Sequence, residues 1–160
     1  TSIIAKEKEE ELKTHFAVPF IENAKALDAY ISVQSEAAVA VTSGVSAMHD
    51  VTEGGIFGAL WEMAEASGVG LEIDLKKIPI RQETVEICEY FDVNPYGLIS
   101  SGMMLMASED GNALVHALAE ANIPATVIGK ATEGNDRVIV RDEERRFLEP
   151  PKTDELYKVL

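Results

Sequence analysis

The chain has one cysteine, few basic residues and no long hydrophobic run. Cys88 has no second thiol with which to pair, so a disulfide scaffold is excluded. No apolar run reaches the roughly 20 residues that a membrane-spanning helix needs, and the first residues do not resemble a signal peptide. We therefore expect a soluble, cytoplasmic protein that does not bind membranes.

Basic side chains are scarce, because 14 Lys and Arg stand against 28 Asp and Glu and give a formal net charge of −14. Such a surface repels the phosphate backbone of nucleic acids and the headgroups of anionic lipids. Neither is an expected partner. A small phosphate-containing ligand is compatible with this charge, because backbone N–H groups can hold an anion locally within a negative field.

The composition is that of an ordinary globular protein. With 160 residues, of which 46% are hydrophobic and 26% charged, the chain can bury a sizeable core. It contains no repeat, low-complexity segment or long linker, so we expect a single domain over residues 1–160. Glu149-Pro150-Pro151 marks the start of a tail over 150–160. Because the chain begins with Thr1 rather than Met, we expect a piece of a longer protein.

Helical and strand patterns are mixed along the chain, which predicts an α+β fold. Thr1–Ala5 is predicted as a strand, and Ser35 as the cap of a short helix. The charged run Arg141–Arg146 is predicted to be a solvated face. The other predicted helices cover 6–16, 19–31, 56–67, 83–91 and 110–122, and the other predicted strands cover 45–48, 69–75, 103–107, 125–128 and 137–140, with 103–107 a central strand.

The segment from His49 to Gly55, HDVTEGG, is the strongest candidate for a binding site. A glycine pair between a strand and a helix lets backbone approach a ligand, and the helix N-terminus favours phosphate. Asp50 at the rim of this turn is a candidate Mg²⁺ ligand, because hard cations prefer oxygen. The structural alternative is that Asp50 or Thr52 caps the helix while the glycines allow tight packing.

Three other features have structural and functional interpretations. Ser100-Ser101-Gly102 adds hydroxyl and backbone donors to the same pocket if its strand lies beside the one ending at His49, or is an ordinary turn. His49 has two interpretations: it acts as a general acid or base, or it is a structural residue held by hydrogen bonds. Cys88, in mid-helix near an apolar face, is expected to be inert packing. No zinc motif is present, and no catalytic residue can be assigned.

The segments AMHDVTEGGI (47–56) and GALWEMAEASGVG (58–70) resemble the C-terminal domain of the AIR (aminoimidazole ribonucleotide) synthase superfamily, near the branch of the hydrogenase maturation factor HypE. The resemblance extends through Glu72-Ile73-Asp74, Ile78-Pro79 and the Ser100-Ser101-Gly102 loop. It implies an α+β fold in which helices pack on the faces of a mixed β-sheet, in part ferredoxin-like.

The resemblance also implies a function. Such proteins are two-domain, ATP-dependent enzymes that activate an oxygen-bearing substrate by phosphoryl transfer with the help of Mg²⁺. The N-terminal half binds ATP and forms the dimer, and the C-terminal half closes over the phosphates. The implied phosphate-binding residues are Thr52, Gly54, Gly55, Ser101 and Gly102, and the implied Mg²⁺ ligand is Asp50.

Two departures from the family pattern bear on function. Val51 and Glu53 stand where the hydrogenase factor typically has Pro and Arg, and the chain ends in Tyr157-Lys158-Val159-Leu160 without a terminal cysteine. We expect the C-terminal half of an ATP-dependent enzyme, inactive alone and part of a homodimer when full length. The alternative is a noncatalytic ligand- or protein-binding domain that retains the fold.

Overall fold

The computed structural model describes residues 1–150 and 152–160, so Pro151, predicted to lead into the tail, lies outside the described residues. The fold is α+β, as predicted. Its α-helices are α1 (Ser2–Glu7), α2 (Glu9–Leu12), α3 (Val18–Ala26), α4 (Gln34–Thr42), α5 (Gly55–Ser67), α6 (Gln82–Tyr90) and α7 (Gly111–Glu120). Its strands are β1 (Val45–Val51), β2 (Gly70–Asp74), β3 (Met103–Ser108), β4 (Gly129–Thr132), β5 (Arg137–Arg141) and β6 (Glu144–Phe147). Short 3-10 helices are η1 (Leu27–Tyr30), η2 (Leu75–Lys77), η3 (Pro95–Gly97) and η4 (Glu155–Lys158).

The strands form two sheets. The larger has the order β4-β2-β5-β6, in which β2 and β5 are parallel and the other neighbours antiparallel. This confirms the mixed sheet that the family resemblance implies. The smaller sheet is the antiparallel pair β1–β3, in which Val51 lies opposite Met103. Met103–Ala107 therefore pairs on one side only among the described residues, and the prediction of a central strand is wrong.

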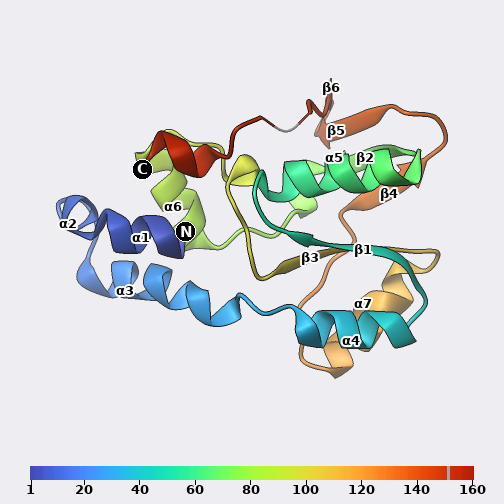
Figure 1. The fold of residues 1–160 in the computed structure, drawn as a ribbon, viewed down its shortest axis with the longest axis horizontal. Coiled ribbons are helices and arrows are strands. Elements are labelled where there is room, and N and C mark those ends of the chain that lie inside the picture. The colour runs from blue at the N-terminus through green and yellow to red at the C-terminus, as the bar shows by residue number, and fades with distance from the viewer. Residues whose placement is uncertain (151) are drawn as a thin grey trace.

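Helix α5 joins the two sheets through one hydrophobic core. Ile56 and Leu60 of α5 pack with Val51 of β1, Ile73 of β2 and Ile139 of β5. On the other side of the β1–β3 pair lie α4 and α7 (Figure 1). Because α5 buries residues against both sheets, its N-terminus is held firmly in place.

A second core lies among the helices at the opposite end of the molecule. Helices α1, α3 and α6 gather there with both termini of the described chain (Figure 1). Its fully buried residues include Ile4, Ile21 and Ile87, and Val159 near the end of the chain joins them. Val159 and Leu156 of the predicted tail are thus packed against the body of the protein.

Two predictions near the start of the sequence are wrong. Thr1–Ala5 lies mostly in helix α1, where Ile4 and Ala5 are fully buried against the helical core. A short apolar run has no periodicity that separates helix from strand, so packing decides. Helix α4 begins at Gln34, so Ser35 lies inside it, and no side chain caps the helix.

One prediction near the end is also wrong. The strand expected over 125–128 is β4, four residues later, because Gly129 passes so close to the Glu72 carbonyl that a Cβ there would overlap it. Pairing with β2, far away in the sequence, sets the position of β4. The run Arg141–Arg146 is exposed, as predicted, and forms the β5–β6 hairpin, which turns at Asp142 with φ 55°.

The Cys88 thiol is expected to be unreactive in the folded chain. Cys88 is 1% exposed, and burial raises the pKa of its thiol to about 11. A thiol-reactive disulfide reagent at pH 8 should therefore react slowly with native protein and at once in guanidinium chloride. The free energy of unfolding should fall as the pH rises from 9 towards 11, because the unfolded thiol loses its proton first. Rapid labelling of native protein would contradict this assignment.

Candidate phosphate site at the β1–α5 junction

The HDVTEGG segment forms the end of β1 and the start of α5. Strand β1 continues to Val51, three residues beyond its predicted end, so His49 and Asp50 belong to it. Gly54 and Gly55 have φ angles of 82° and 62°, in the left-handed region that favours glycine. Gly54 is the N-cap residue, and no side chain caps α5 in the usual way. The alternative that Asp50 or Thr52 is the cap is therefore wrong.

Gly55 has a structural role that requires the absence of a side chain. A Cβ there would lie 2.6 Å from the Tyr96 carbonyl oxygen and 2.7 Å from that of Leu98. The start of α5 thus packs directly on the backbone of the segment between α6 and β3. Phe57 completes the contact by stacking on Tyr96, with ring centroids 5.2 Å apart. The structural interpretation of the glycines predicts a tight approach of the helix to the sheet, whereas the close contact of Gly55 is with the segment around η3.

An anion already lies at the N-terminus of α5. The Gly54 N–H donates to Oδ2 of Asp154 at 2.6 Å, and the Leu156 N–H donates to Oδ1 at 2.8 Å. Asp154 is 1% exposed, so its carboxylate is buried between the tail and the turn. Sequence reasoning missed Asp154. Its position before η4 marks it as a local cap, but nothing in the sequence indicates Gly54, 100 residues away, as its second partner.

The same helix start retains donors for a further anion. The first four N–H groups of a helix lack acceptors within the helix. Gly55 N–H donates to the Thr52 carbonyl at 3.0 Å, whereas no acceptor among the described residues is recorded for Ile56 or Phe57. Two N–H groups at the start of α5, beside the Asp154 carboxylate, are therefore left for a further acceptor.

Asp50 has an exposed side chain, whereas both ring nitrogens of His49 are hydrogen-bonded. The Asp50 side chain is 63% exposed and lies on the face of β1 opposite to His49 and Val51. In the described part of the chain no group of three His, Cys, Asp or Glu is placed to hold a metal. Asp50 therefore fits Mg²⁺ only as one ligand among phosphate and water oxygens, the arrangement that Mg²⁺ commonly adopts. His49 Nδ1 lies 2.6 Å from the Asp50 carbonyl oxygen and Nε2 2.9 Å from Glu62 Oε2, so both ring nitrogens are engaged.

The Ser100-Ser101-Gly102 loop reaches the same end of the β1–β3 pair as the turn, because Met103 lies opposite Val51. Gly102, at φ 99°, packs on the backbone of Tyr30, which a Cβ would overlap. The structure thus accounts for Gly102 without a ligand. Ser101 is exposed, and its hydroxyl has no recorded partner among the described residues.

Positive charge comes from the β5–β6 hairpin. The Arg146 guanidinium lies 5.8 Å from the centre of the Phe57 ring, in the first turn of α5. Sequence reasoning treated this residue as part of a solvated charged run. The arginines are evident in the sequence, but only the pairing of β6 with β5 brings Arg146 to the start of α5.

The fold and the junction define an α+β domain whose central helix presents an anion-binding N-terminus. The profile of the family "AIR synthase related protein, C-terminal domain" matches residues 1–141. The chain belongs to this family. No described helix is long and apolar enough to cross a membrane.

Known proteins show how far the similarity extends. A putative hydrogenase expression/formation protein of Methanocaldococcus jannaschii is 35% identical over 120 residues, which cover 72% of this chain and 36% of the relative. The crystal structure of Escherichia coli HypE, a hydrogenase maturation protein, superposes with a TM-score of 0.69 at 23% identity, over 80% of this chain and 42% of the other. AaThiL complexed with AMPPCP and TMP gives a TM-score of 0.63 at 19% identity, over 96% of this chain and 47% of the other. The structural similarities show the shared fold, and the chain spans less than half of each of these proteins.

Gly55→Ala is expected to destabilise the fold by about 2–4 kcal/mol, because a left-handed φ and a backbone overlap act together. Gly68→Ala is a matched control: it lies at the other end of α5, has the same φ of 62°, and its Cβ would meet nothing within 4 Å. It should cost only about 1 kcal/mol. Chemical denaturation measures both. Equal losses would mean that the approach to Tyr96 and Leu98 is not constraining.

Asp154→Ala should lower the free energy of unfolding by roughly 2–3 kcal/mol, because two N–H groups lose a charged acceptor. Asp110 is the control, since its carboxylate caps α7 at 2.9 Å from Ala113 N at an exposed site. Asp110→Ala should cost only about 1 kcal/mol. If both variants lose the same amount, the buried link to Gly54 adds nothing to stability.

Proposed function

We propose that this chain is the C-terminal half of an ATP-dependent enzyme that activates an oxygen-bearing substrate by phosphoryl transfer. Its part is to bind phosphate at the β1–α5 junction and to close the active site. Membership of the AIR synthase-related family supports this, as do the relatives' names, which include HypE in complex with ATP and AaThiL with AMPPCP. The N-terminal half would bind most of the nucleotide and form the homodimer.

The observation that carries the proposal is the state of the α5 N-terminus. It holds one buried carboxylate through Gly54 N–H and has two further N–H groups without recorded acceptors among the described residues. A helix start of this kind favours anions through both its donors and its dipole. Thr52, Gly54 and Gly55 shape this turn, and Ser101 is the hydroxyl of the neighbouring loop that would add a contact.

Negative charge at the junction makes a cation necessary. Glu53 and Asp154 lie in or against the turn, and both oppose a phosphate. Mg²⁺, when bound, neutralises phosphate charge and stabilises charge that develops during phosphoryl transfer. Asp50 would hold the ion on its exposed carboxylate. Because the described residues assemble no nucleophile and base at the junction, the chain alone should not turn over ATP.

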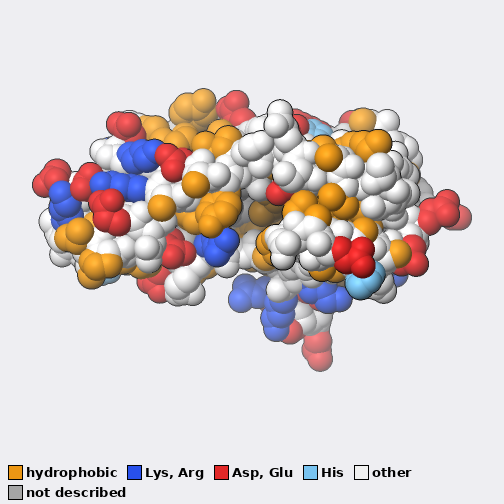
Figure 2. Space-filling model, turned by 90° about the horizontal axis from the view of Figure 1, so that it is seen from below, with side chains coloured by type: hydrophobic (Ala, Val, Ile, Leu, Met, Phe, Trp, Pro, Cys, Tyr) orange, Lys and Arg blue, Asp and Glu red, His pale blue; other side chains and the backbone are white. Residues whose placement is uncertain are grey.

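A noncatalytic binding domain is the second candidate. The Asp154 carboxylate on Gly54 N–H and the Glu53 charge favour it, since both disfavour phosphate. Hydrophobic side chains are also scattered over the face seen in Figure 2. Exposed apolar residues in and beside η1 and α4 include Tyr30, Ile31 and Val41, at 63%, 54% and 67% exposure. A protein partner could contact such residues.

Titration of the isotope-labelled chain with Mg-ATP tests the proposal. Amide shifts should be confined to Asp50–Ile56 and its surroundings, and Asp50→Asn should weaken the Mg²⁺-dependent part roughly tenfold. Asp110→Asn, at the N-terminus of α7, removes the same charge and should leave binding unchanged. ATP turnover by the chain alone above that of Asp50→Asn would overturn the expected division of labour. No response, even with the N-terminal half present, would favour the noncatalytic domain.

A further inference from the structure

Arginine is concentrated in one part of this acidic chain. Four of its five arginines lie in β5 and β6. Arg137 pairs with Glu65 at 2.6 Å, and Arg145 pairs with Glu72 at 2.7 Å. Arg141 and Arg146 have no carboxylate within 4.0 Å among the residues that the structure describes. Two guanidinium groups are thus left for another anion.

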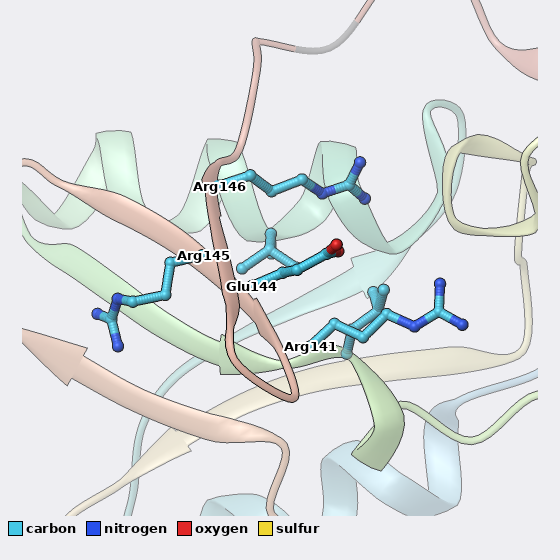
Figure 3. A pocket seen from close by; sticks show the side chains of 6 residues that line it. Arg141, Glu144, Arg145 and Arg146 are labelled. Atoms are coloured by element: carbon cyan, nitrogen blue, oxygen red, sulfur yellow. The ribbon is translucent and has the colours of Figure 1, made fainter.

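Strand register places these two arginines on one face of the hairpin. Arg146 lies opposite Ile139, and Arg141 lies opposite Glu144, so all four share the face on which Ile139 packs against α5. Arg145 is on the other face. Figure 3 shows the Arg141, Glu144 and Arg146 side chains directed to one side and Arg145 to the other.

The direction of α5 shows which end of the helix the arginines approach. Arg137, at the start of β5, stacks on Trp61 at 4.2 Å. Arg146, paired two residues further along β5, lies 5.8 Å from the centre of the Phe57 ring, one helical turn nearer the N-terminus of α5. Arg141 is a further two residues along the strand, about 7 Å on. The arginine face therefore extends towards the end of α5 that carries Gly54 and Gly55.

A cavity lies along this face. Its volume is about 380 Å³, and it is lined by Leu75, Ile139, Arg141, Glu144, Arg145 and Arg146 (Figure 3). On the α5 side two guanidinium groups face one carboxylate, Glu144. Guanidinium binds phosphate through paired charge-assisted hydrogen bonds, and the cavity is larger than a single phosphate requires.

We propose that Arg141 and Arg146 bind one phosphoryl group of a polyphosphate whose other end lies at the start of α5. This rests on the proposed function for the β1–α5 end, and it names the ligand class: a compound with two or more linked phosphoryl groups rather than a phosphate monoester. The hairpin supplies the positive charge that the turn, with Glu53 and Asp154, lacks.

Binding of inorganic pyrophosphate and orthophosphate to the 160-residue chain, at fixed ionic strength, tests the proposal. Arg141→Gln and Arg146→Gln should each weaken pyrophosphate binding about tenfold, the size expected for a charge-assisted contact, and change orthophosphate binding less than twofold. Arg81→Gln is the control, because it removes the same charge at an exposed site before α6, outside the hairpin and its cavity. It should change neither affinity more than twofold, and thermal unfolding would verify that all three variants fold.

Each outcome decides the matter. Equal loss in all three variants would mean general surface electrostatics, and no loss in Arg141→Gln and Arg146→Gln, or no pyrophosphate binding at all, would also overturn the proposal. Amide shifts separate it from the proposed function. Pyrophosphate shifts at the hairpin without shifts at Gly54 and Gly55 would retain an arginine site and remove the phosphate site at the turn. Shifts at the turn alone would retain the phosphate site at the turn and remove the arginine site.

Discussion

The close packing of the α5 start on the backbone of residues 96–98 is the constraint on which the rest of the structure depends. Gly55 allows it, since any side chain would overlap two carbonyl oxygens. Through it, the sheet core around α5 meets the helical core that contains Leu98. Asp154 adds a second connection by bringing the chain's last residues to Gly54. One junction thus ties together both cores and the C-terminal segment.

The same junction makes the chemistry of the site unusual. A helix N-terminus favours an anion, yet in this chain a buried carboxylate already uses one of its donors. A phosphate there must share the space with Asp154 and Glu53 in a chain of net charge −14. In the proposed function its binding would therefore depend on cations from elsewhere: a metal ion at Asp50, and guanidinium groups from a hairpin that is remote in sequence.

Local patterns predicted many elements correctly. Alternation and glycine stops predicted β2, β3, β5 and the end of α5 at Gly68, because these signals act within a few residues. Predictions at Thr1–Ala5 and 125–128 were wrong because burial and strand pairing overrode them. Of the candidate site, the turn with its glycines was evident from the sequence, whereas Asp154 and Arg146 were not.

The sequence by itself determined the fold class, the family and the turn, because periodicity, glycine spacing and the HDVTEGG segment are local. Only the tertiary structure decided what surrounds that turn. Asp154 reaches Gly54 across 100 residues, and Arg146 reaches Phe57 through the register of β6 on β5. Such contacts arise when distant elements bury their apolar faces against α5, and no local pattern specifies them.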